Sequence, residues 1–121
     1  NTTKPLVVIN VVGLTHGMLG RDTPHISALA AEGFARPLLT VFPAVTCSVQ
    51  TSLLTGSLPR EHGIVGNGWY DRELAEVFFW RQSNRLVQGE RLYDAARRID
   101  PAYTTAKMFW WYNMYADVDY S

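Results

Sequence analysis

The sequence predicts an α/β fold, and three observations support that prediction. Leu6–Val12 is almost continuously apolar and rich in β-branched residues, which is typical of a strand buried on both faces of a parallel sheet. A helical pattern follows between Thr23 and Gly33. Strand-like and helix-like segments then alternate as far as residue 111. This alternation indicates a central, mainly parallel sheet with flanking helices.

Composition limits the classes of protein to which the chain could belong. The 121 residues are enough for one domain, and 47% hydrophobic with 18% charged residues is ordinary for a globular protein. Eleven basic residues balance eleven acidic ones, so we expect neither nucleic acid nor a membrane surface as a partner. Nothing resembles a signal peptide, although one could have been cleaved before Asn1. The cellular location therefore stays open, with a slight preference for the cytoplasm.

The first half of the chain contains two predicted strands and two predicted helices. Thr23 can cap the first helix, Pro24 suits its first position, and Gly33 is a natural stop. A second strand is predicted at residues 38–42, before Pro43. A second helix is predicted at about Ser48–Thr55, because Gly56 follows it as a stop.

The second half begins with a predicted loop at Gly56–Gly68, which is rich in glycine and proline. A strand is predicted at Glu76–Trp80. Residues 91–98 show helical spacing, with Leu92, Ala95 and Ile99 on one face. Residues 104–111 form a further predicted strand.

Thr46 stands where a loop turns into the second helix. The start of a helix offers unpaired backbone N–H groups and a partial positive charge, which would stabilise a phosphate oxygen or an alkoxide. A plainer interpretation is that Thr46 or Ser48 only caps the helix. The local pattern leaves both interpretations open.

Several short motifs occur in a fixed order along the first half of the chain. Thr23–Gly33 is followed by Phe-Pro-x-x-Thr, Thr-Gly, Pro-x-x-His-Gly-Ile and an asparagine, whose fixed residues are Phe42, Pro43, Thr46, Thr55, Gly56, Pro59, His62, Gly63, Ile64 and Asn67. Together they resemble the type I phosphodiesterase/nucleotide pyrophosphatase family of the alkaline phosphatase superfamily. The resemblance implies an alkaline phosphatase-like α/β domain. We expect residues 1–121 to be the N-terminal portion of one such domain, in a considerably longer protein.

The resemblance also implies a chemistry. Thr46 would attack phosphorus and form a covalent phospho-enzyme that water then hydrolyses. The substrate would be a small phosphate ester or a nucleotide with a phosphodiester or pyrophosphate bond. Family members usually hold two divalent metal ions, commonly zinc, and Thr46 would also contact one of them.

One metal ligand of the family is missing. Val12 stands where the family has an aspartate before Gly-hydrophobic, and valine cannot bind a metal. Asn10 lies two residues earlier and therefore on the same face of the predicted strand, so its amide oxygen could substitute. Asn10 could equally be a hydrogen-bonded polar group near a strand end. The remaining ligands are expected outside this chain.

The residues after Thr46 are candidates for binding the substrate. The family often has an asparagine three residues after the nucleophile, and the resemblance implies that its amide helps to bind a phosphoryl oxygen. This chain has Val49 there, which cannot donate a hydrogen bond, so the oxyanion would be stabilised by backbone N–H groups such as that of Cys47 or by groups elsewhere. Gln50 is a second candidate. Packing is the better interpretation for His62, which has no second ligand at metal-binding spacing.

Several further possibilities remain open. The aromatic run at residues 109–112 could stack a nucleobase. Such clusters more often belong to a core or an interface. Exposed apolar surface could also drive association with other molecules.

In place of a phosphodiesterase, the chain could belong to a phosphomonoesterase or phosphonate hydrolase of the same superfamily. It could also belong to a degenerate, non-catalytic domain, which the missing aspartate favours.

Overall fold

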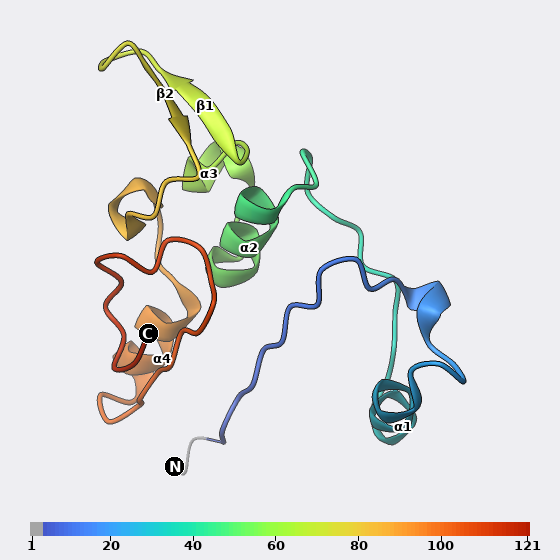
Figure 1. The fold of residues 1–121 in the computed structure, drawn as a ribbon. Helices are drawn as coiled ribbons and strands as arrows, with labels where there is room; N and C mark the ends of the chain where they lie inside the picture. The colour runs from blue at the N-terminus through green and yellow to red at the C-terminus, as the bar shows by residue number, and fades with distance from the viewer. Residues whose placement is uncertain (1–3) are drawn as a thin grey trace. The chain divides into compact units, whose positions relative to one another are not determined.

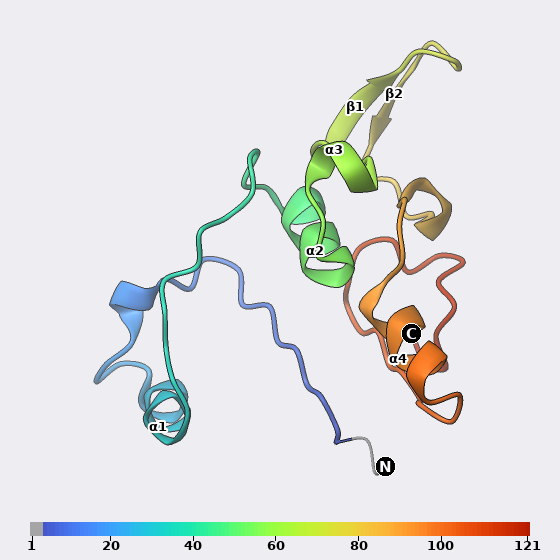
Figure 2. The same ribbon diagram turned by 180° about the vertical axis from the view of Figure 1, so that it is seen from behind.

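The computed structural model describes residues 4–121, which form two compact units divided after Leu39. Figures 1 and 2 show the ribbon from opposite sides. Both helices and strands are present, in agreement with the predicted α/β content.

The first unit contains one short 3-10 helix, η1 (His16–Met18), and one α-helix, α1 (Pro24–Glu32). The helix begins and ends as predicted, with Pro24 in its first turn and the N–H of Gly33 donating to Leu29 O at 3.1 Å. Thr23 occupies the N-cap position, but its side chain does not cap the helix. The Thr23 hydroxyl instead donates to Met18 O at 2.9 Å and stabilises the preceding loop.

The strand predicted at Leu6–Val12 is wrong for this structure. The segment has no ladder partner among the described residues, and Val7, Ile9 and Val12 are each more than three-quarters exposed. Residues 38–42 are not a strand either, and Leu39 and Phe42 are almost fully exposed. A strand requires hydrogen bonds from a neighbouring strand, and residues 4–121 supply no neighbour for these two segments.

The second unit contains most of the regular structure. Its elements in chain order are α2 (Thr46–Thr55), α3 (Pro59–His62), β1 (Gly68–Asp71), β2 (Glu76–Phe79), the 3-10 helix η2 (Asn84–Leu86) and α4 (Leu92–Ile99). Helices α2 and α4 were both predicted, and α2 begins two residues earlier than expected. Gly56 ends α2 in the left-handed region, with φ of 64°, which glycine adopts at low cost. No helix in residues 4–121 is long and apolar enough to cross a membrane.

The only sheet in the described part of the chain is an antiparallel hairpin. Strand β1 pairs with β2 in a register that runs from Gly68 opposite Phe79 to Asp71 opposite Glu76. The prediction of β2 is confirmed, whereas β1 was missed. The predicted central parallel sheet is not formed by residues 4–121.

The core of the second unit lies against α2. Cys47, Ile64, Val87 and Tyr112 are buried together, with Trp69, Leu86 and Trp111 packed around them. The segment predicted as a strand at residues 104–111 makes only an isolated bridge, from Ala106 to Tyr120. The aromatic run is divided between two environments, because Tyr112 enters the core while Phe109 is 98% exposed.

A buried lysine holds the C-terminal segment in place. Lys107 Nζ donates to the carbonyl of Tyr112 at 3.0 Å, and the Lys107 N–H donates to the carbonyl of Tyr120 at 2.8 Å. Burial, assisted by the charge of Arg91, lowers the pKa of Lys107 to about 8. The last fifteen residues thus fold back on the unit without forming a helix or a strand.

Candidate functional site

Thr46 is the first residue of α2 and is half-buried. The N-cap position belongs to Val45, whose side chain cannot cap the helix. The Ser48 hydroxyl lies 2.6 Å from the carbonyl of Pro43 and so is directed at the preceding loop. The Thr46 hydroxyl has no hydrogen-bond partner among residues 4–121. The cap interpretation is therefore wrong for the side chains of Thr46 and Ser48.

Asn67 caps α2 from twenty residues downstream. Its Oδ1 accepts a hydrogen bond from the backbone N–H of Cys47 at 3.0 Å. That N–H was predicted to stabilise an oxyanion, but the structure shows it already occupied. With Oδ1 engaged in this way, the other half of the amide, Nδ2, keeps both of its donor hydrogens, and no residue in the described part of the chain accepts them.

Asn67 was not predicted as a site residue, although it was part of the motif. The signal was its position between Gly66 and Gly68 at the end of the loop that follows α3. Glycines on both sides allow the backbone to approach other groups closely. In Figures 1 and 2 the base of the hairpin lies beside the start of α2, and the hydrogen bond from the Cys47 N–H places Asn67 there.

The side chain of Cys47 belongs to the core. It is fully buried, and burial raises the pKa of its thiol. The Tyr112 hydroxyl interacts with this thiol without forming a hydrogen bond of good geometry, and burial raises the pKa of that hydroxyl as well. A buried thiol in its neutral form is a small apolar group, so we assign no chemistry to it.

Gln50 lies one turn after Thr46 on α2 and is 6% exposed. Its Oε1 accepts a hydrogen bond from the backbone N–H of Trp111 at 3.0 Å. The predicted role of Gln50 in binding substrate is not tested by this contact. The contact does show that one half of its amide is committed to the protein.

Asn10 belongs to the first unit and Thr46 to the second, and their role as metal ligands stays a prediction. Asn10 is exposed and makes no hydrogen bond with any other described residue. No group of three His, Cys, Asp or Glu side chains within residues 4–121 could hold a metal ion. Within residues 4–121 these side chains therefore do not make up a complete set of metal ligands.

His62 is fully buried at the end of α3 and has a structural role, as predicted. Its Nδ1 accepts the N–H of Ile64 at 3.1 Å, and its Nε2 lies 2.9 Å from Ser52 Oγ on α2. Because Nδ1 is an acceptor, Nε2 carries the proton and donates to Ser52, which fixes one neutral tautomer. Burial lowers the pKa of His62. His62 thus joins α3 to α2 as a neutral group.

We expect the stability of the protein to fall as pH drops below about 6.5, the ordinary pKa of an unfolded histidine. The folded pKa of His62 is lower, so between the two values the unfolded chain binds more protons and each fall in pH favours unfolding. One such group changes stability by at most about 1.4 kcal/mol per pH unit. Urea unfolding at pH 7.5 and 5.5 measures this slope. His62→Gln should flatten it, and an unchanged slope in the variant would contradict the assignment.

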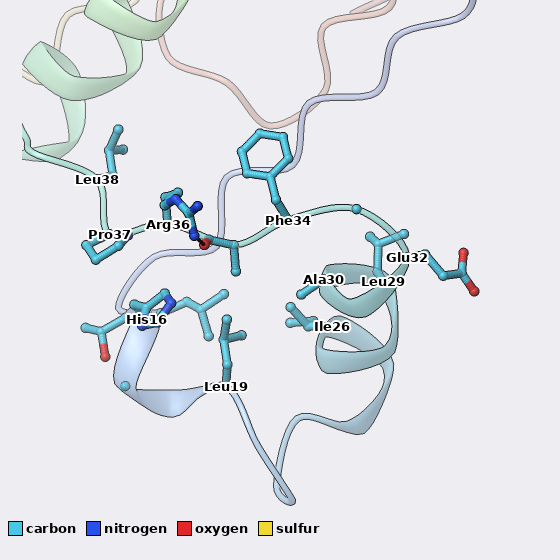
Figure 3. A pocket seen from close by; sticks show the side chains of 15 residues that line it. His16, Leu19, Ile26, Leu29, Ala30, Glu32, Phe34, Arg36, Pro37 and Leu38 are labelled. Atoms are coloured by element: carbon cyan, nitrogen blue, oxygen red, sulfur yellow. Dashed lines mark hydrogen bonds between the residues drawn. The ribbon is translucent and has the colours of Figure 1, made fainter.

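A separate hollow lies in the first unit, between η1 and α1 (Figure 3). Its volume is about 1280 Å³, and mostly apolar side chains such as Leu19, Ile26, Leu29 and Phe34 line it, together with His16. None of the predicted site residues is among its lining residues. We therefore assign this hollow no part in the chemistry of Thr46.

Comparisons with known proteins agree with the motif order. The sequence profile described as type I phosphodiesterase / nucleotide pyrophosphatase matches residues 6–121. The chain is 56% identical over 81 residues to alkaline phosphatase PafA of Elizabethkingia meningoseptica. The matched region covers 57% of this chain and 15% of that protein. The chain is also 32% identical over 75 residues to an uncharacterized pyrophosphatase/phosphodiesterase of Schizosaccharomyces pombe. This matched region covers 60% of this chain and 16% of that protein. The matches thus span about a sixth of the length of these curated relatives.

Proposed function

Because this chain belongs to the type I phosphodiesterase / nucleotide pyrophosphatase family, we propose that it is part of a hydrolase of phosphodiester or pyrophosphate bonds in which Thr46 is the nucleophile. One observation carries this proposal. Thr46 lies at the start of a ten-residue helix, and its hydroxyl is unpaired among residues 4–121, while Asn67 supplies the cap that the side chain of Val45 cannot provide. The hydroxyl is therefore not needed to hold the helix in place.

In the proposed reaction, the Thr46 hydroxyl loses its proton to solvent and its Oγ1 attacks phosphorus, so that an O–P bond forms as the bond to the leaving oxygen breaks. The leaving oxygen takes a proton from water and departs as an alcohol or a phosphate. Water then attacks the phosphorus of the phosphothreonine, the bond between Thr46 Oγ1 and phosphorus breaks, the hydroxyl regains a proton, and phosphate or a phosphate monoester is released. The positive end of α2 favours the negative charge of the phosphoryl group throughout.

Asn67 is proposed to donate a hydrogen bond to a non-bridging phosphoryl oxygen. Its Oδ1 is fixed by the N–H of Cys47, so the Nδ2 donors are held in a defined orientation beside the helix start. A donor fixed before the reaction requires no reorganisation when charge develops. Asn67 therefore takes the role first predicted for the Cys47 N–H.

The proposal includes two divalent metal ions, with zinc as the expected metal. The described residues lack the required ligands, so most of the ligand set is placed outside residues 1–121, with Asn10 and Thr46 as the contributions from this chain. When bound, such ions would supply positive charge next to the phosphoryl group.

Residues 1–121 are proposed to be the N-terminal portion of one alkaline phosphatase-like domain with a parallel sheet. The support comes from the apolar side chains of Leu6–Val12, which are exposed within residues 4–121. Such a segment becomes a buried strand only where a sheet supplies neighbours on both edges and cover on both faces. The surrounding chain would supply them. Association with other molecules through this apolar surface stays a prediction.

A phosphomonoesterase is the second candidate function. It is favoured by the 56% identity to an alkaline phosphatase, which exceeds the 32% identity to the pyrophosphatase/phosphodiesterase. Thr46 and Asn67 would serve a monoester or a diester equally, because each contacts only the transferred phosphoryl group. The groups that bind the part of the substrate outside the transferred phosphoryl group must therefore determine whether a monoester or a diester is preferred.

The test compares kcat/KM of the intact protein for bis(p-nitrophenyl) phosphate and p-nitrophenyl phosphate, with and without a chelator and with zinc restored. We expect hydrolysis of the diester to be favoured and to be lost on chelation. A preference for the monoester would select the second candidate. No hydrolysis of either ester, in a folded protein that binds no zinc, would favour the degenerate domain.

A further inference from the structure

Four contacts form a closed ring that starts and ends on the first turns of α2. The Cys47 N–H donates to Asn67 Oδ1, and the carbonyl of Asn67 accepts the N–H of Trp80 at 2.9 Å. The indole of Trp80 packs on that of Trp111, with ring centroids 4.8 Å apart and planes tilted by 34°. The N–H of Trp111 then donates to Gln50 Oε1. Gln50 is three residues from Cys47 and therefore on the same side of the helix.

The ring holds one residue in an unfavourable conformation. Trp80 has φ of 51°, in the left-handed region that a bulky side chain rarely adopts. Such a conformation persists only where the surroundings impose it. Here it directs the Trp80 N–H at Asn67 and its indole at Trp111. The hairpin base is thereby fastened to the segment that follows α4.

We propose that Gln50 is a positioning residue for the reaction of Thr46, and that it acts through Trp111 and Trp80 to hold the amide of Asn67 beside the nucleophile. This inference rests on the proposed function. It assigns Gln50 a role different from the predicted contact with substrate. The side chain is buried and its oxygen is engaged by Trp111, so Gln50 affects the phosphoryl group through Asn67 and not by direct contact.

The position of Asn67 matters because its donor is used in the transition state. Asn67 has two points of attachment in the ring, its side-chain oxygen and its main-chain carbonyl. If Gln50 releases Trp111, Trp80 loses the support of the Trp111 indole, and the carbonyl end of Asn67 is then held less firmly while the Cys47 contact remains. The Nδ2 donors then become less well aligned, which lowers kcat more than it changes KM.

The test is a double-mutant cycle on the intact protein with bis(p-nitrophenyl) phosphate as substrate. Gln50→Met keeps the length of the side chain and removes the acceptor. We expect kcat to fall about tenfold with KM nearly unchanged, because contacting residues couple on this scale. In an Asn67→Ala background, Gln50→Met should have no further effect on kcat. Gln88→Met is the matched control, since Gln88 is exposed and outside the ring, and it should behave as the wild type.

The outcomes separate this inference from the function on which it rests. Equal fold losses from Gln50→Met with and without Asn67 would overturn the positioning role, as would a change in KM alone. Full activity in Thr46→Ala would instead overturn the proposed function. If Gln50→Met does not fold, Trp111→Leu carries the test, because it removes the indole contact and keeps the N–H that Gln50 accepts. Its loss of kcat should also vanish in the Asn67→Ala background, and persistence there would overturn the inference.

Discussion

Thr46→Ala is expected to lower kcat for the preferred phosphate ester by roughly 10⁴- to 10⁶-fold, the range found when a member of a nucleophilic catalytic unit is removed. The reason is that no other hydroxyl takes the same position. Ser48 is the nearest in sequence, and its hydroxyl is directed at the carbonyl of Pro43. Steady-state kinetics on the intact protein measures the loss. An acid quench followed by mass spectrometry should detect phosphate on Thr46 in the wild type alone.

The matched controls are Thr46→Ser and Ser48→Ala. Thr46→Ser keeps the hydroxyl and should retain most of the activity. Ser48→Ala removes a hydrogen bond to the backbone, so it should reduce stability by about 1 kcal/mol with turnover preserved. Thr46→Ala itself should unfold at nearly the wild-type denaturant concentration, because its hydroxyl makes no hydrogen bond in residues 4–121. Wild-type turnover in Thr46→Ala would contradict the nucleophile assignment.

Asn67→Ala is expected to give the second largest effect, a fall in kcat of about 10²- to 10³-fold, as for the loss of one fixed oxyanion donor. It should also cost about 1 kcal/mol of stability, because α2 loses the cap on Cys47. Kinetics and urea unfolding of the same preparation give the two values.

Asn67→Asp distinguishes the two roles of Asn67. The aspartate keeps an oxygen for the Cys47 N–H and suits the positive end of a helix, so stability should be retained. It has no amide donor and adds a negative charge beside the phosphoryl group, so kcat should fall at least as far as in Asn67→Ala. A stable and fully active Asn67→Asp protein would show that the donor role is wrong and that Asn67 is only a cap.

The sequence predicted α1, α2 and α4 because their signals are local, whereas α3 lies in the segment predicted as a loop at Gly56–Gly68. Pro24 and Gly33 delimit α1, and Gly56 delimits α2, each through the conformations that proline and glycine prefer. Strand predictions depend on partners elsewhere. Glu76–Phe79 is a strand because Gly68–Asp71 pairs with it, and Leu6–Val12 is not one because no described segment does. Apolar content alone cannot reveal whether such a partner exists.

The candidate site was predicted in part. The position of Thr46 at a helix start follows from the local pattern. The role of Asn67 depends on a hydrogen bond across twenty residues, and that of Gln50 on one across sixty-one. Neither pairing leaves a periodic or short-range signal in the sequence. The N–H of Cys47 was predicted as a donor because its occupation by Asn67 could not be foreseen.

The ring of contacts around α2 joins residues that lie far apart in the sequence, and this separation affects when the ring can form during synthesis of the chain. Helix α2 is held by contacts between residues close in sequence, but the hydrogen bond from the Trp111 N–H to Gln50 joins residues sixty-one positions apart. Contacts at such separation form late, because closing the intervening loop costs entropy before the contact repays it. A nascent chain that ends before Trp111 can therefore display Thr46 on a formed helix while Asn67 is only half restrained. We therefore expect the ring to close only after Trp111 has left the ribosome and can reach Gln50.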